Sequence, residues 1–171
     1  HKVGIKTTST IMFGHVDRPV HWARHLLHLR DLQQRTGGIT EFVPLPFVPM
    51  EAPMFRRGLS RQGPTMRESV LMHAVSRLVL HSLIDNIQVS WVKMGEPGVV
   101  ACLNAGANDM GGTLMNESIS RAAGATHGQE MTVATMTALL QGIGRPARQR
   151  STFYGEVTAH PDQLIPLHSS S

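Results

Sequence analysis

The stretch Thr7-Thr8-Ser9-Thr10-Ile11-Met12-Phe13-Gly14-His15 decides the fold of this chain. Its β-branched residues are typical of a buried strand, and Gly14-His15 indicates that a loop follows. Asp17 and Pro19 come next, and an acidic cap with a proline close behind it is a usual signal for the start of a helix. We therefore expect a strand, a short loop and a helix that Asp17 caps.

The helix after Asp17 should be amphipathic. Trp22, Leu26 and Leu29 fall at i, i+4 and i+7, so one face of the segment is apolar until about residue 34. Gly37-Gly38 then provides the usual terminator, because glycine adopts the left-handed conformation that ends many helices. Together these residues predict one complete strand–helix unit.

A second unit begins with a strand predicted at 39–47, whose Pro44 and Pro46 should lie at its end or on an irregular edge. A loop without periodicity fills 48–64, and loops of this length are usually functional or mobile. Thr65 and Glu68 form a capping box and open the second helix, which should end near residue 82. Its expected apolar stripe consists of Val70, Leu71, Ala74, Val75, Leu78 and Val79.

Two further units complete the pattern. We predict a third strand at 87–94, closed by Gly95, and a short return helix at 99–103. A fourth strand is predicted at 110–115, and helices are predicted at 116–123 and 132–141. Gly142 and Gly144 end the last helix. Residues 159–171 resemble a poorly ordered tail, so we expect one domain over residues 1–158.

Four strand–helix alternations indicate an α/β fold with parallel strands. A closed (β/α) TIM-type barrel uses eight such units in about 250 residues, so four units predict half of one. The alternative, a doubly wound open sheet, usually carries G-x-G-x-x-G after its first strand, and that motif is absent. The chain starts at His1 without a methionine, and we expect it to be cut from something longer.

The composition narrows the function class. The chain has 171 residues, a formal net charge of +4 and one cysteine, Cys102. A single thiol excludes an intrachain disulfide, is consistent with a reducing cytoplasm, and leaves no self-contained iron–sulfur or four-cysteine zinc site. Its arginines are spread along the sequence, which argues against nucleic-acid binding, and no apolar run is long enough to cross a membrane.

Ligands of a (β/α) barrel bind at the C-terminal ends of its strands, which selects candidate residues by position alone. Gly14, Pro44 and Pro46 fall at these predicted exits, and Gly111-Gly112 would let backbone amides approach a ligand closely. The candidates for ligand binding are Met12, His15, Phe47, Trp91, Lys93, Asn108, Asp109, Gly111, Gly112, Thr113 and Glu117.

Several of these residues allow a structural and a functional interpretation. His15 has the position of a general base or a substrate hydrogen-bond partner, and equally that of a loop histidine bound to backbone. A charge such as Lys93 at the end of an apolar strand should face an anionic ligand or solvent. His21, His25 and His28 share a helix face that we interpret as solvated rather than metal-binding, and Cys102 as an inert core thiol.

Four ordered blocks of the sequence resemble one enzyme family. They are 7–15, the stretch 36–47 that includes Pro44-Leu45-Pro46-Phe47, 88–95 with Ser90-Trp91-Val92-Lys93, and 106–117 with Asn108-Asp109-Met110-Gly111-Gly112-Thr113. They are similar to the radical S-adenosylmethionine enzymes that make the deazaflavin FO, the precursor of coenzyme F-420. The resemblance is to the tyrosine-condensing 4-hydroxyphenyl transferases, or the corresponding half of fused FO synthases, and Arg145-Pro146 with Gln149-Arg150-Ser151-Thr152 resembles the family's closing segment.

The resemblance implies that a 4Fe-4S cluster cleaves S-adenosylmethionine, and that the hydroxybenzyl part of L-tyrosine is joined to 5-amino-6-(D-ribitylamino)uracil. In this family a C-x-x-x-C-x-x-C motif in the N-terminal half of the barrel holds the cluster, and this chain lacks it. The resemblance therefore implies that the chain is the C-terminal half of a radical S-adenosylmethionine barrel. We therefore expect the intact parent to be the enzyme, the chain alone to be inactive, and its partner to be an N-terminal half-barrel or the second FO synthase component.

Two other interpretations stay open at this point. A futalosine-pathway radical enzyme of menaquinone biosynthesis has similar blocks, although 44–47 and 90–93 favour the FO branch. The chain could instead be a non-enzymatic half-barrel that binds a ligand or self-associates through its open sheet edge.

Overall fold

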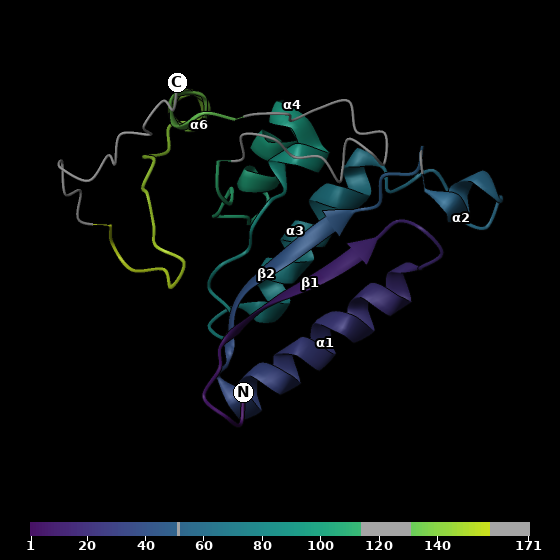
Figure 1. The fold of residues 1–171 in the computed structure, drawn as a ribbon, viewed down its shortest axis with the longest axis horizontal. Coiled ribbons are helices and arrows are strands. Elements are labelled where there is room, and N and C mark those ends of the chain that lie inside the picture. The colour runs from purple at the N-terminus through teal and green to yellow at the C-terminus, as the bar shows by residue number, and fades with distance from the viewer. Residues whose placement is uncertain (51, 114–130, 158–171) are drawn as a thin grey trace, which may run out of the picture.

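A computed structural model describes residues 1–50, 52–113 and 131–157 of the chain. Strand β1 (Thr7–Phe13) and strand β2 (Ile39–Pro46) pair in parallel, with Ile11 opposite Pro44 and Phe13 opposite Pro46. Helix α1 (Pro19–Thr36) connects them and ends at Gly37, whose φ of 60° is left-handed. The first predicted strand–helix unit and the second strand are therefore confirmed, and Figure 1 shows β1 and β2 side by side with α1 next to them.

The parallel order continues beyond β2 through single bridges. Phe42 of β2 pairs with Ile87, and Gln88 pairs with Asp109, both in the parallel sense. We call residues 87–89 the third segment and residues 108–112 the fourth segment. Each segment lies beside the one that precedes it in the sequence, with no reversal of order, whereas a doubly wound sheet reverses at its switch point. Helix α3 (Met66–Leu80) packs against α1 and against α4 (Trp91–Asn104), so these helices form one layer. This mixed α/β arrangement is compatible with a half-barrel.

The predicted third strand at 87–94 is wrong beyond residue 89. Helix α4 begins at Trp91, and the amides of Lys93 and Met94 donate to the Ser90 carbonyl at 3.2 and 3.0 Å. A short apolar run suits a buried strand or a buried helix equally well, so the sequence alone could not separate them. Gly95, the predicted terminator, lies instead at a kink inside α4 with a φ of 62°. The expected helix at 99–103 is part of α4.

The fourth strand predicted at 110–115 is wrong for residues 110–113, which form no regular element, and the bridge at Asp109 precedes it by one residue. Leu114, Met115 and the predicted helix at 116–123 lie outside the described residues, as does the predicted tail at 159–171. Helix α6 (Val133–Gly142) confirms the helix predicted at 132–141. Its cap is Thr132, whose side chain accepts a hydrogen bond from the Thr135 amide at 3.1 Å.

The capping box of α3 is confirmed, since Thr65 Oγ1 accepts from the Glu68 amide and the Glu68 carboxylate accepts from the Thr65 amide. The predicted apolar stripe is rotated, however. Leu71 and Leu78 are 50% and 78% exposed, whereas the buried residues of α3 are Ser69, Met72, His73, Ser76 and Leu80. The loop before α3 contains the short helix α2 (Pro53–Arg56) and is otherwise irregular.

Pro44 lies inside β2 rather than at its end, and the pairing explains why this is tolerated. The Phe42 amide donates to the Asn86 carbonyl at 2.9 Å, toward the third segment. Residue 44 has the same backbone orientation as residue 42, because the period of a strand is two. Among the described residues the third segment pairs only at Ile87 and Gln88, so the N–H that Pro44 lacks is not needed.

The two faces of the sheet differ in character. One core cluster packs Leu26, Leu29 and Phe42 between α1, the sheet and α3, and a second surrounds α4. On the opposite face Met12 is 50% exposed and Thr8 and Thr10 are also exposed. Residues 145–157 reach that opposite face through Arg150 and lie away from α1 in Figure 1. No helix in the described part of the chain is long and apolar enough to span a membrane.

Candidate functional site

The first strand exit is organised by Asp17. Its carboxylate accepts hydrogen bonds from the Gly14 amide at 2.9 Å, from the His15 amide at 2.8 Å and from Trp22 Nε1. The prediction that Asp17 caps α1 is wrong, because Arg18 is the N-cap residue. Burial alone would raise the pKa of Asp17, but these donors outweigh it and hold the pKa below its usual value. Asp17 is thus an ionised anchor for the turn that follows β1.

His15, Met12 and Phe47 are brought together at this exit. The Val16 amide donates to His15 Nδ1 at 2.7 Å, which assigns the ring proton to Nε2, and Nε2 donates to the Met12 carbonyl at 3.1 Å. The ring lies edge-on to Phe47 with centroids 5.8 Å apart. Both nitrogens are therefore engaged, which corresponds to the backbone-bound interpretation of His15 in this conformation.

The fourth segment forms a second turn of similar design. Asp109 Oδ1 accepts from the Gly111 amide at 2.6 Å, and Gly111 has a left-handed φ of 74°. One residue further on, the Gly112 carbonyl accepts from Trp91 Nε1 at 3.2 Å. Four predicted residues, Trp91, Asp109, Gly111 and Gly112, thus meet where the third and fourth segments end.

Arg150 connects this second turn to β2. Its Nε donates to Asp109 Oδ2, and its Nη2 lies 3.6 Å from Glu41 Oε2. The Tyr154 hydroxyl donates to the same Glu41 oxygen, and the Arg150 guanidinium lies 4.0 Å from the centre of the Tyr154 ring. We call Glu41, Asp109, Arg150 and Tyr154 the Arg150 cluster.

The electrostatics of the Arg150 cluster follow from its burial. The Glu41 and Asp109 side chains are only 12% and 9% exposed, so two carboxylates with little solvent share one guanidinium. The hydrogen bond to Asp109 raises the pKa of Arg150 further above its usual value. Burial, followed by the bond to Glu41, raises the pKa of the Tyr154 hydroxyl, so the phenol stays protonated and donates.

The other predicted site residues lie elsewhere. Asn108 is at the entry end of its segment and is structural: its Oδ1 accepts from the Ile87 amide at 2.9 Å and from Arg77 at 2.8 Å. Lys93 is half-buried on the first turn of α4 rather than at the end of a strand. Thr113 is exposed at the limit of a described range, and Glu117 lies outside the described residues.

Sequence reasoning missed Glu41, Arg150 and Tyr154. The sequence does contain a signal for Glu41, because it is the one charged residue in the strand predicted at 39–47. The same argument selected Lys93. Arg150 and Tyr154 had none of that kind, since they follow the last helix in an irregular segment. Their partners are 41 and 113 residues away in the sequence.

The residues of this chain do not fit an iron–sulfur cluster. Cys102 is its only cysteine. The side chain is fully buried in the core around α4, as predicted, and burial raises the pKa of its thiol to about 12. In the described part of the chain, no group of three or more His, Cys, Asp or Glu side chains is arranged to hold a metal ion.

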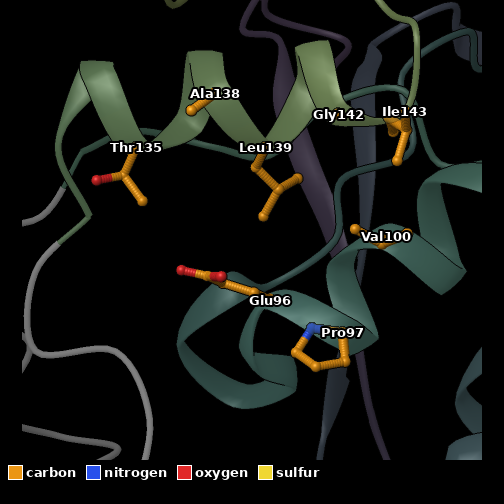
Figure 2. Close-up of a pocket in the computed structure, with 8 residues that line it drawn as sticks. All are labelled: Glu96, Pro97, Val100, Thr135, Ala138, Leu139, Gly142 and Ile143. Atoms are coloured by element: carbon orange, nitrogen blue, oxygen red, sulfur yellow. The ribbon is translucent and has the colours of Figure 1, made fainter.

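A shallow groove of about 450 Å³ lies between α4 and α6, with Glu96 and Leu139 pointing into it from opposite sides (Figure 2). Its lining is mostly apolar and includes none of the predicted site residues. The lining residues are Glu96, Pro97, Val100, Thr135, Ala138, Leu139, Gly142 and Ile143. The strand exits, not this groove, gather the polar groups that chemistry would use.

Comparison with known proteins identifies the family. Residues 36–162 match the model of the CofH/MqnC C-terminal region, and the chain belongs to this family. It is 52% identical over 167 residues to the FO synthase of Nocardia farcinica and 54% identical over 159 residues to that of Mycobacterium tuberculosis strain H37Rv. It is 48% identical over 160 residues to the 5-amino-6-(D-ribitylamino)uracil–L-tyrosine 4-hydroxyphenyl transferase of Methanopyrus kandleri.

These relatives are much longer than the matched region. The alignments cover 98%, 93% and 94% of this chain, but only 19% of each FO synthase and 43% of the transferase. The resemblance to the FO enzymes is therefore confirmed for this region. The names of these relatives favour FO biosynthesis over the menaquinone alternative.

Proposed function

We propose that this chain is the C-terminal part of a transferase of FO biosynthesis, which joins the hydroxybenzyl part of L-tyrosine to 5-amino-6-(D-ribitylamino)uracil. The observation that supports this most directly is its identity of 48% to a transferase named for those two substrates. The second support is architectural. Parallel segments in sequential order, with helices in one layer, are what half of a (β/α) barrel requires.

In this proposal residues 1–158 form the second half of the barrel, and an N-terminal half-barrel or a second FO synthase component completes it. The two strand exits face the ligands: Met12, His15 and Phe47 at one, Trp91 with 109–112 at the other. Phe47 and Trp91 are nearly buried at these exits, so in this proposal they shape the site through the groups they contact, the His15 ring and the Gly112 carbonyl. The whole enzyme would be cytoplasmic.

The radical chemistry of the family needs a 4Fe-4S cluster and S-adenosylmethionine, and the cluster does not fit this chain. Its one thiol is buried, and burial raises the pKa of that thiol, whereas a cluster needs several thiolates. The cluster ligands must therefore come from another part of the parent enzyme. Anaerobic reconstitution of the chain alone with iron and sulfide should yield no 5′-deoxyadenosine from S-adenosylmethionine, and turnover would contradict this proposal.

A chimera tests the function directly. The matching 159 residues of the Mycobacterium tuberculosis FO synthase would be replaced by those of this chain, and FO formation followed by mass spectrometry. We expect product from the chimera and none from the same enzyme with those residues deleted. A chimera that melts cooperatively and binds its cluster, yet makes no FO, would refute the proposal.

A further inference from the structure

The geometry points to Arg150, which lies in the C-terminal segment 145–157 after α6, as a positioning residue. Arg150 fixes the conformation of the turn 109–112, and through that turn it holds Trp91 in place at the strand exit. This inference rests on the proposed function, because it assigns that turn to the substrate side of the barrel. Its structural part can be tested without any activity.

The first step is the salt bridge itself. Glu41 on β2 and Asp109 on the fourth segment both point to the face opposite the helices, with the third segment between them. Two nearly buried carboxylates near one another repel. Arg150 bonds to one and lies 3.6 Å from the other, so its positive charge offsets that repulsion and holds β2 and the fourth segment to the same group.

The second step runs from Asp109 to the strand exit. While Arg150 binds Oδ2, Oδ1 is directed at the Gly111 amide at 2.6 Å. This bond fixes the left-handed Gly111, beside which the Gln88 side chain packs so tightly that a Cβ would come within 2.6 Å of its amide nitrogen. The next carbonyl, that of Gly112, accepts from Trp91 Nε1. A continuous set of contacts therefore joins Arg150 to Trp91.

The third step concerns what holds Arg150. Tyr154 has a φ of 63°, which is rare for a bulky residue and costs conformational energy. The strain accompanies a specific arrangement. The Ser151 amide donates to the Gly155 carbonyl, the Gly155 amide donates to Ser151 Oγ, and the Tyr154 ring lies against the guanidinium. The segment 150–156 is thus folded so that Tyr154 supports Arg150 and binds Glu41.

The experiment places 5-fluorotryptophan at position 91, or at position 22 as a control, in the whole protein, and records the fluorine resonance. Arg150→Gln should shift the resonance at 91 and leave that at 22 in place, because Trp22 is bonded to Asp17 in the other turn. The matched control is Arg148→Gln, an exposed arginine of the same segment, which should move neither. Equal shifts at both positions, or none at 91, would overturn the inference.

Kinetics and a double-mutant cycle complete the test. Arg150→Gln should lower kcat/KM by about 10-fold to 100-fold, as expected when a positioned group is displaced by about 1 Å, and Arg150→Lys should restore part of it. In an Asp109→Asn background, Arg150→Gln should add little further shift at Trp91, because the contact through which it acts is gone. Additive shifts would refute the coupling.

The outcomes separate this inference from the function on which it rests. If the resonance at 91 moves as expected but the whole protein does not use L-tyrosine, the proposed function fails and the contact route stands. If the protein makes FO and the resonance at 91 is unmoved, the positioning role fails. Should Arg150→Gln not fold, Arg150→Lys and Tyr154→Phe repeat the fluorine measurement with the charge kept.

Discussion

The turn after β1 and the turn at 109–112 are both held by an aspartate that binds backbone amides, but the side chains that bind the two aspartates come from different distances along the sequence. Each has an aspartate that accepts backbone amides, Asp17 from Gly14 and His15, and Asp109 from Gly111. The side-chain donor to Asp17 is Trp22, five residues away on α1, whereas the side-chain donor to Asp109 is Arg150, 41 residues away. All donors to the first aspartate therefore come from its own strand–helix unit, whereas the second aspartate depends on the residues that follow α6.

This difference predicts how each turn fails. A local turn should lose stability when its own residues change and should be insensitive to the C-terminal segment. A turn held from a distance should respond to changes in either place. Substitutions in the two turns test that contrast, from the largest expected effect to the smallest.

Gly14→Ala should be the most damaging change. Gly14 has a φ of 91°, and a Cβ there would overlap the rigid ring and the backbone nitrogen of Pro64, which directly precedes the N-cap of α3. Strain and overlap together should cost about 3 kcal/mol or more in free energy of unfolding, measured by denaturant titration of the whole protein.

Gly37→Ala is the matched control, because its φ of 60° is also left-handed but a Cβ there meets nothing within 4 Å. It should cost only about 1 kcal/mol. Equal losses for the two variants would show that contact with Pro64 does not matter.

Asp17→Asn should cost about 2 kcal/mol at pH 7, because hydrogen bonds to a charged acceptor are lost and the amide N–H₂ opposes the Trp22 N–H. The pKa of Asp17 is lowered in the folded protein. Its contribution is therefore present above the ordinary carboxyl pKa of about 4 and disappears as the pH falls through the lower folded value.

The measurement for Asp17 is the stability difference between wild type and variant from pH 7 down to pH 3. That difference should shrink below about pH 4. A difference that stays constant across this range would mean that Asp17 acts through its shape and not through its charge.

Gly111→Ala tests the distant turn and should cost about 1–2 kcal/mol, less than Gly14→Ala. Its φ of 74° is strained for alanine, but the obstacle is the amide end of Gln88, which can rotate away. In the whole protein this variant should shift the fluorine resonance of 5-fluorotryptophan at position 91 and leave the resonance at position 22 unchanged. The reverse pattern would contradict the assignment of Gly111 to the second turn.

The smallest expected effect compares the two tryptophans. Trp22→Phe removes a donor to a carboxylate, whereas Trp91→Phe removes a donor to a neutral carbonyl at 3.2 Å. Both rings are nearly buried, so the apolar cost of the two changes should be similar. Thermal unfolding should show a larger loss for Trp22→Phe, by about 1 kcal/mol. A larger loss of stability for Trp91→Phe would show that the Trp91 hydrogen bond stabilises the protein more than the Trp22 hydrogen bond does.

Much of the first turn could be predicted from the sequence because its causes are local. The β-branched run predicted β1, the apolar spacing of Trp22 and Leu26 predicted α1, and the Thr65–Glu68 pattern predicted the start of α3. The sequence correctly marks Asp17 as a hydrogen-bonding residue next to the start of α1, but not which amides it binds. Asp17 binds the turn before the helix rather than capping the helix itself.

Much less of the second turn could be predicted. Residues 90–94 are apolar enough for a strand, and their helical state depends on burial against α3 and α6, which no local pattern specifies. The ring nitrogens of His15 are engaged by backbone groups, a fact that spacing cannot reveal. Asn108 was selected with the exit residues, but it precedes the bridge at Asp109 and lies at the entry of its segment.

The sequence by itself determined the first strand–helix unit, the capping box of α3, the buried Cys102 and the family, because short-range periodicity, turn chemistry and extended similarity are all written along the chain. Only the tertiary structure decided that Glu41, Asp109, Arg150 and Tyr154 meet on one face. The physical reason is distance along the chain. Charges far apart in sequence can meet only after the parallel segments are aligned, and then burial strengthens their interaction.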